Sequence, residues 1–208
     1  MELSVVDFGA RLPGWVADEI AGVDRRLGHV EDRMRLAHRL AGRNHREGTG
    51  GPFAAVVSDT ATGEVLAVGV NLVLASGLSG MHAEMVALCL AQAAAGTWDL
   101  GGAGRAPVEL AVNWRPCAMC YGAVLWSGVA RLVIAGEGDE VEHLTGFDEG
   151  PMRPDWKEQL AARGVQVRTD VLREEALATF REYGERTDVV VYNGGGRGRS
   201  DARVLQVE

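Results

Sequence analysis

Hydrophobic and polar residues follow two different periods along the chain, and together they predict a mixture of helices and strands. The clearest helical pattern spans residues 29–46, where apolar residues recur every three or four positions among charged ones. Its apolar positions are Val30, Met34, Ala37, Leu40 and Ala41. A loop rich in glycine at 48–52 ends this pattern. Two β-rich runs follow at 53–58 and 64–71, and the Thr/Gly segment between them predicts a hairpin.

The remainder of the chain alternates between helical and strand patterns. The predicted helices after the hairpin span 82–95, 117–126, 155–163 and 171–183. The predicted strands span 108–112, 131–135, 165–168 and 188–192. Strands that alternate with helices after an antiparallel hairpin predict an α/β fold, namely a three-layer α/β/α sandwich around a mixed central sheet.

Length and composition suit one domain with additional segments at its ends. The chain has 208 residues, of which 47% are hydrophobic and 24% charged, so it can bury a core without covalent cross-links. Residues 1–28 show no clear period and are interpreted as an N-terminal extension. The predicted domain spans 29–193, and 194–208 form a Gly/Arg-rich tail.

Charge and apolar pattern disfavour several classes of partner. The net charge of −8 argues against a protein that contacts many phosphates, so nucleic acid is not expected as a partner. No run of about 18 apolar residues predicts a membrane span, and residues 1–10 do not resemble a signal peptide. Three cysteines in such a chain point to the reducing cytoplasm rather than to a disulfide framework.

Two short motifs, each at the start of a predicted helix, contain the chemistry-bearing residues. The first contains His82 and Glu84, and the second is Cys117-x-x-Cys120 after a proline. One imidazole and two thiolates are suitable zinc ligands, and three protein ligands leave a fourth position for water, as a catalytic zinc requires. Glu84, two residues from His82, can then face that water and move protons without binding the metal. This combination is typical of zinc-dependent deaminases.

A structural zinc site and a redox pair are alternative roles for these residues. His143 could complete a structural zinc site as a fourth ligand, and a Cys-x-x-Cys pair alone also occurs in redox proteins. A redox pair, however, gives no role to His82 or Glu84. Cys89, seven residues after His82 on the apolar face of its helix, is expected to be buried.

Beyond these motifs, much of the chain resembles the cytidine deaminase superfamily and, within it, the guanine and ammeline deaminases. The segments that resemble this branch include Gly50-Gly51-Pro52-Phe53-Ala54, Gly69-Val70-Asn71, the two zinc motifs, Gly122 to Val129, Gly146 to Pro151, Leu172 to Glu175 and Val190 to Asn193. The resemblance implies a cytidine deaminase-like fold, hydrolytic release of ammonia from a nucleobase-like small molecule, one zinc ion per chain, and a homodimer.

The resemblance also implies roles for individual residues. His82, Cys117 and Cys120 would bind zinc and Glu84 would transfer protons, with Glu149 as a second catalytic acid. The implied substrate-binding residues are Asn71, Phe53, Trp126, Tyr192 and Asn193. For some of them a simpler interpretation remains: Asn71 could only end a strand, Glu149 could be a loop acid, and Trp126 could belong to the core.

Two departures from the family pattern affect the expected substrate. Arg115 stands directly before Pro-Cys, where the family usually has a glutamate, and the tail after Asn193 is longer. The sequence therefore predicts deamination of guanine or of a related aminopurine, pterin or triazine, without choosing among them. A tRNA or other nucleic-acid deaminase, which shares the zinc motif, and a non-catalytic zinc module remain the alternatives.

Overall fold

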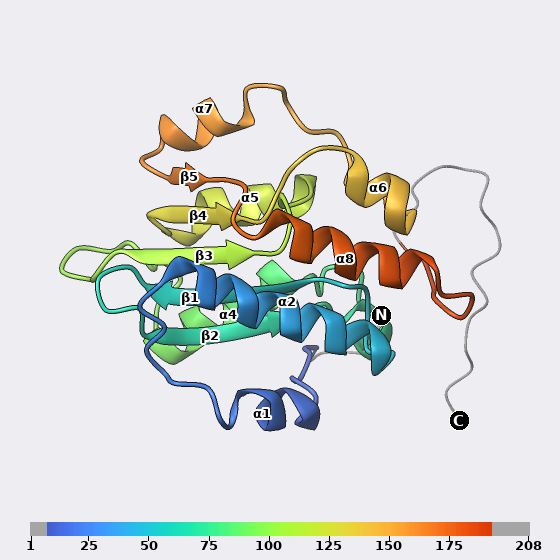
Figure 1. The fold of residues 1–208 in the computed structure, drawn as a ribbon. Coiled ribbons are helices and arrows are strands. Elements are labelled where there is room, and N and C mark those ends of the chain that lie inside the picture. The colour runs from blue at the N-terminus through green and yellow to red at the C-terminus, as the bar shows by residue number, and fades with distance from the viewer. Residues whose placement is uncertain (1–7, 193–208) are drawn as a thin grey trace, which may run out of the picture.

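A five-stranded mixed sheet forms the centre of the computed structural model, which describes residues 8–192 (Figure 1). Its strand order is β2-β1-β3-β4-β5. The hairpin strands β1 (Ala54–Asp59) and β2 (Val65–Val70) are antiparallel. β3 (Val108–Val112) pairs antiparallel with β1, whereas β4 (Arg131–Ile134) and β5 (Gln166–Arg168) continue in parallel. The predicted mixed sheet is confirmed.

Helices cover both faces of this sheet and complete the predicted α/β/α sandwich. α2 (Val30–Arg46) and α8 (Arg173–Gly184) pack on one face (Figure 1). The other face is covered by α4 (Ala83–Ala95), α5 (Ala118–Ser127) and α7 (Trp156–Ala161). Three short helices were not predicted: α1 (Gly14–Ile20), α3 (Val73–Ser76) and α6 (Glu140–Thr145).

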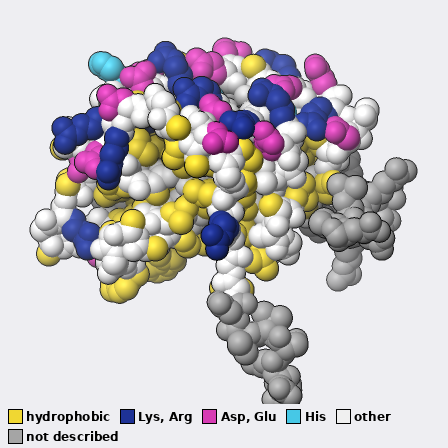
Figure 2. Space-filling view, turned by 90° about the horizontal axis from the view of Figure 1, so that it is seen from below, with side chains coloured by type: hydrophobic (Ala, Val, Ile, Leu, Met, Phe, Trp, Pro, Cys, Tyr) yellow, Lys and Arg dark blue, Asp and Glu magenta, His cyan; other side chains and the backbone are white. Residues whose placement is uncertain are grey.

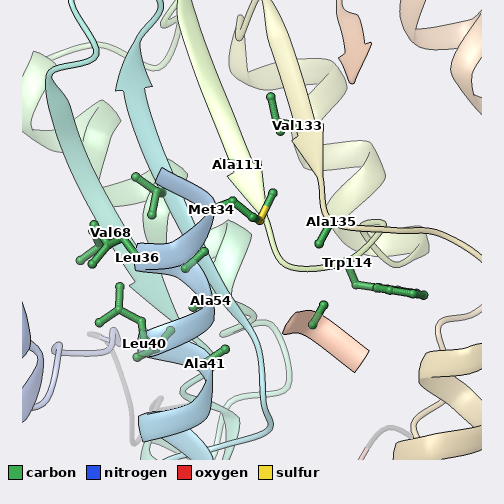
Figure 3. Close-up of a cluster of buried hydrophobic side chains, with 14 of the residues drawn as sticks. Met34, Leu36, Leu40, Ala41, Ala54, Val68, Ala111, Trp114, Val133 and Ala135 are labelled. Carbon is green, nitrogen blue, oxygen red and sulfur yellow. The ribbon is translucent and has the colours of Figure 1, made fainter. Parts of the chain in front are cut away.

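The core on the α2 side follows directly from the hydrophobic pattern. Met34 and Leu40 of α2 are fully buried, and their face of the helix meets the sheet (Figure 3). The facing sheet residues are Ala54, Val68, Ala111 and Val133. Burial of a large apolar side chain stabilises the fold by about 1.5–3 kcal/mol, so this layer holds α2 firmly against the strands whose ends carry the candidate site.

Two sequence-based expectations about local structure are wrong. Residues 188–192 were expected to form a strand, but they have irregular backbone. The Val190 carbonyl accepts a hydrogen bond from Tyr183 at 3.0 Å, and Tyr192 packs on Phe147, so tertiary contacts and not a strand ladder hold this segment. Cys89 is exposed on α4 and not buried, because the apolar face of that helix turns Ala87, Leu88 and Ala91 toward the sheet instead.

The N-terminal region packs against the domain. Glu19 of α1 pairs with both Arg39 and Arg43 of α2 at 3.1 Å, and Val16 belongs to the same core as α2. Within residues 8–192, no helix is long and apolar enough to cross a membrane.

The buried His38 of α2 predicts a loss of stability in acid. Among residues 8–192, neither of its ring nitrogens has a partner for a hydrogen bond of normal geometry. Burial lowers its pKa to about 4, and the nearby Leu172 backbone offsets only part of this effect. Because the folded pKa lies below the unfolded value of 6.5, the unfolded chain binds more protons, so the stability present above pH 6.5 is lost as the pH falls toward 4.

The unfolding free energy of the parent protein should therefore fall when the pH is lowered from 7.5 to 4.5. In His38→Leu, we expect this fall to be smaller by about 2–3 kcal/mol. Urea unfolding at the two pH values measures this difference. His143→Leu is the matched control, because that side chain is exposed on α6. Equal pH dependence in the parent and in His38→Leu would contradict the assignment.

Candidate functional site

Three side chains that can bind a metal meet where two helices begin. His82 is the N-cap of α4, Cys117 is the N-cap of α5, and Cys120 lies in the first turn of α5. Their ligand atoms all lie within 4.8 Å of one another, and the Cys117 Sγ lies 3.5 Å from the His82 Nδ1. The positive ends of the two helix dipoles favour negative charge at this point.

The geometry and chemistry of this cluster fit zinc. Zn–S bonds of about 2.3 Å and Zn–N bonds of about 2.0 Å put sulfur and nitrogen about 3.5 Å apart around a tetrahedral ion, which matches the observed Cys117–His82 separation. Within residues 8–192, the cluster has no fourth His, Cys, Asp or Glu. His143, the expected candidate for that position, is exposed on α6 and faces Asp139 instead.

The two cysteines differ in how readily they lose their protons. A hydrogen bond from Cys120, supported by one from His82, lowers the pKa of Cys117 to about 4 even though burial opposes this. The bond to Cys117 and burial raise the pKa of Cys120 instead. The protein's own groups therefore prepare Cys117 as a thiolate, the form that binds a metal.

Gly69 of β2 lets α4 approach the sheet closely enough to form this cluster. A methyl group at this glycine would overlap the carbonyl of Ala83 and the backbone of Ala87. The start of α4, with His82 as its N-cap and Glu84 in its first turn, therefore packs directly on β2, the strand that Asn71 follows.

A narrow cavity opens beside the cluster and brings most of the predicted site residues together. It is lined by Phe53, Asn71, His82, Glu84, Val112, Trp114, Arg115, Cys117, Glu149 and Tyr192. These residues come from the ends of β1, β2 and β3, the beginnings of α4 and α5, the loop before α7, and the segment after α8. Residues that are distant in sequence therefore share one site.

Two buried carboxyl groups face this cavity. Burial and the nearby Cys117 raise the pKa of Glu84 to about 7. The same two effects, together with the charge of Glu84, raise the pKa of Glu149 to about 8. Glu109, also fully buried, differs because Arg33 and Arg131 pair with it at 2.8 and 3.3 Å. Buried acids with raised pKa values in a cavity are suited to proton transfer.

Glu149 reaches the site through a backbone contact. Its carbonyl oxygen accepts a hydrogen bond from the Ala118 amide at 3.0 Å, which satisfies one of the free donors at the start of α5. Its own amide donates to Glu142 at 3.3 Å. The loop is thereby held one residue away from Cys117, so its acid faces the same cavity as Glu84.

Two hydrogen bonds hold Asn71 in place, and its Nδ2 group is left available as a donor. Its Oδ1 accepts a hydrogen bond from the Val73 amide at 3.1 Å, and its carbonyl accepts one from Asn44 at 2.8 Å. No hydrogen bond joins its Nδ2 group to another residue in the described part of the chain. Because Asn71 lines the cavity, this amide is a donor available to a bound molecule.

Aromatic rings close one side of the cavity. Phe53 packs edge-on against Phe147 with ring centroids 5.4 Å apart, and Phe147 contacts Tyr192 at 4.9 Å. The Tyr192 hydroxyl accepts a hydrogen bond from the Gly51 amide at 2.9 Å. A side chain at Gly51 would collide with Tyr192 and Phe147, so glycine permits this close contact.

The fold and this cluster agree with comparison to known proteins. Residues 28–136, more than half of the chain, match the cytidine and deoxycytidylate deaminase zinc-binding region. The chain belongs to this deaminase family. It is therefore a zinc-binding deaminase, that is, a hydrolase of C–N bonds.

The relatives of this deaminase include guanine deaminases. Guanine deaminase from Bacillus subtilis is 31% identical over 57% of this chain and 71% of its own length. The tRNA-specific adenosine deaminase of the same organism is 40% identical over 63% and 76%. Guanine deaminase from Nitrosomonas europaea superposes with a TM-score of 0.79, at 40% identity over 88% of this chain and 98% of that one. A further structure, 42% identical over 88% and 95% with the same TM-score, contains 2,6-diaminopurine.

One of the expected binding residues of the deaminase lies outside the cavity, and the structure does not describe another. Trp126 is 79% exposed on α5 and does not line the cavity, so within this chain it is neither a wall of the site nor part of the core. It lies more than two turns after Cys117, on a side of α5 that the sheet does not cover. Asn193 lies outside the described residues.

The structure also adds residues to the site that sequence reasoning had not assigned to it. Val112 and Trp114 line the cavity, as does Arg115, which the sequence had linked only to the choice of substrate. Asn113 accepts a hydrogen bond from the Ala54 amide at 3.0 Å and donates one to the Pro52 carbonyl at 2.9 Å, which ties this strand end to the glycine loop. Their position directly before Pro-Cys is the signal that could have identified them, because a strand that leads into a ligand motif ends at the site.

Proposed function

We propose that this deaminase hydrolyses guanine or a closely related amino-heterocycle, such as another aminopurine, a pterin or an ammeline-like triazine, and releases ammonia. The proposal depends on one observation: two buried carboxyl groups, Glu84 and Glu149, share a cavity with a three-ligand metal cluster. The resemblance to guanine deaminases over nearly the whole of a solved relative supports the choice of substrate class.

In this proposal, one zinc ion per chain is held by His82, Cys117 and Cys120. When bound, zinc supplies Lewis-acid chemistry that lowers the pKa of water toward about 7. Glu84 removes a proton from the attacking water and returns it to a ring nitrogen of the substrate. Glu149, whose pKa of about 8 keeps it largely protonated at neutral pH, donates a proton to the departing amine. The C–O bond forms as water attacks, and the C–N bond breaks as the amine takes the proton of Glu149. The hydroxyl proton of the adduct returns to Glu149 as the oxo group forms and ammonia leaves, so both carboxyl groups are restored.

The remaining binding groups orient a flat ring. The free Nδ2 of Asn71 donates to a ring nitrogen or oxo group, Phe53 and Tyr192 cover the faces and edge of the ring, and Asn193 is proposed to extend the same closing segment. Aromatic walls of this kind provide contact area while a few polar groups select the substrate.

A panel assay tests the proposed function. Purified protein loaded with zinc is incubated with guanine, guanosine, other aminopurines, pterins, ammeline and cytosine, and ammonia is quantified. We expect release from guanine or from one of its close analogues. No release from any purine, pterin or triazine by the zinc-loaded protein would overturn the proposal.

Asn71→Asp separates the binding role of Asn71 from its structural role. The aspartate keeps an oxygen for the Val73 amide but loses the Nδ2 donor, so we expect KM for guanine to rise at least about 10-fold, the amount expected for one lost hydrogen bond in a buried site. Because Asn71 is buried, the new carboxyl group should also lower the unfolding free energy, so the assay is run where urea unfolding shows the variant to be folded. Steady-state kinetics and urea unfolding measure the two effects, and an unchanged KM would show that Asn71 only ends the strand.

A second candidate function is deamination of tRNA adenosine, because a relative with that name is 40% identical to this chain. The net charge of −8 argues against it, since such enzymes need phosphate contacts. A gel-shift assay with labelled tRNA, followed by analysis for inosine, distinguishes the two. Salt-sensitive binding with inosine formation would favour the RNA substrate.

We further propose that the protein is a homodimer in the cytoplasm. Met119 and Trp126 of α5 are 41% and 79% exposed, and Leu90 of α4 is 38% exposed. From below, hydrophobic side chains extend over one part of the surface while charged ones gather on another (Figure 2). Burial of such apolar residues favours self-association, and two cysteine ligands favour a reducing compartment. Residues 29–193 would form the deaminase domain, with 1–28 and 194–208 as extensions.

A further inference from the structure

Arg115 is a charged residue of the cavity whose side chain has no hydrogen-bond partner within residues 8–192. It lines the cavity together with Glu84 and Glu149, and its Nε is buried without a hydrogen bond. Its backbone amide donates a hydrogen bond of 2.9 Å to the Gly136 carbonyl. Within the described part of the chain, its guanidinium forms no hydrogen bond or ion pair.

The other inward-facing arginines show how unusual this is. Arg33 donates to Glu109 at 2.8 Å and also to the Leu27 carbonyl. Arg173 lies over the Trp114 ring at 4.8 Å and pairs with Glu140. Buried donors in folded proteins are almost always bonded, and a charged one left unpaired is costly. Such a group in a cavity is therefore expected to find its acceptor in the molecule that binds there.

The neighbouring acids do not supply that acceptor. Arg115 lines the same cavity as Glu84 and Glu149, but within residues 8–192 no hydrogen bond or ion pair joins its guanidinium to either carboxyl group, and its Nε is left without an acceptor. The guanidinium and the two acids instead offer a bound ring several donors around a single cavity.

We propose that Arg115 is a specificity-determining residue that donates a hydrogen bond to an oxo oxygen of the substrate. A guanidinium presents only donors, so it stabilises a ring with an oxo group and leaves an analogue without that oxygen poorly bound. The deaminase therefore selects amino-oxo-heterocycles, such as guanine, over amino-heterocycles without the oxo group, such as 2-aminopurine. This inference rests on the proposed function and narrows its substrate class.

The test compares guanine with 2-aminopurine, which has the same amino group but no oxo oxygen, in the parent protein, Arg115→Met and Arg115→Lys. We expect Arg115→Met to lower kcat/KM for guanine by about 10- to 100-fold, mostly through KM, and to change that for 2-aminopurine less than about threefold. Arg115→Lys should recover part of the preference. Arg163→Met, at an exposed position beyond α7, is the matched control and should change neither value.

Two outcomes overturn the inference: an equal loss on both substrates, or no loss on either. Zinc content and urea unfolding of each variant show whether the fold is intact, and the ratio between the two substrates is insensitive to a general loss of folded protein. Failure of the proposed function is separate, because the parent protein would then release ammonia from neither compound. In that case, calorimetry measures the affinities of guanine and 2-aminopurine for the parent protein and for Arg115→Met. If each compound binds both proteins equally well, the role of Arg115 is overturned.

Discussion

Glu84→Gln is expected to lower kcat for ammonia release by about 10²–10⁴-fold, the usual contribution of a general acid–base group. Glu84 lies in the first turn of α4, two residues after His82, and faces the cavity with a pKa of about 7. It can therefore both accept and donate a proton near neutral pH. Glutamine has nearly the same shape but cannot exchange a proton in this way, so binding should remain while the chemical step slows.

The fold should tolerate this substitution. The pKa of Glu84 is raised from 4.5 to about 7 in the folded protein, because burial disfavours the charged form. The unfolding free energy of the parent protein therefore falls as the pH rises through this range. A neutral amide avoids this cost, so the unfolding free energy of the metal-free variant at pH 8 should equal or exceed that of the parent.

The measurements for Glu84 are steady-state kinetics, zinc content and urea unfolding, with Glu158→Gln as the matched control on the exposed face of α7. We expect the control to behave as the parent protein does. Activity that survives in Glu84→Gln with the metal retained would remove Glu84 from its assigned role, and loss of zinc in the same variant would show that it acts on the cluster instead.

The parts of the fold that follow from local pattern were predictable. The helix expected at 29–46 is observed as α2, because its apolar residues recur at the helical period and its face has a sheet to cover. Residues 188–192 show where such reasoning ends. A run of valines favours a strand, but a strand also needs a neighbouring strand to pair with. Here the segment contacts Tyr183 and Phe147 instead.

The candidate site divides in the same way. The cluster of His82, Cys117 and Cys120 was predictable, because each residue sits in a short motif at a helix start. The approach of Glu149 depends on a backbone bond to Ala118, which no pattern of side chains indicates. Trp126 shows the opposite difficulty: α5 is apolar on several sides, so its sequence does not reveal which side the sheet covers and which stays exposed.

Cys117→Ala is expected to abolish metal binding and, with it, ammonia release, by at least about 10³-fold. Removal of one of three protein ligands leaves His82 and Cys120, too few to hold zinc at low concentration. Because zinc binds the folded chain and not the unfolded one, its loss should also lower the melting temperature. The structural cause lies at the start of α5, since Cys117 is its N-cap and its Sγ lies 3.5 Å from the Nδ1 of His82.

Cys89→Ala provides the matched control, because this third cysteine is exposed on α4 and belongs to no ligand cluster. Metal analysis of the purified proteins should give about one zinc per chain for the parent and Cys89→Ala, and close to none for Cys117→Ala. Treatment of the parent with a chelator should reproduce the melting temperature of Cys117→Ala, which separates the effect of the metal from that of the lost sulfur. If Cys117→Ala kept its zinc and its activity, the ion would have to be held by residues other than His82, Cys117 and Cys120. The cavity beside these three residues would then no longer be the place of proton transfer.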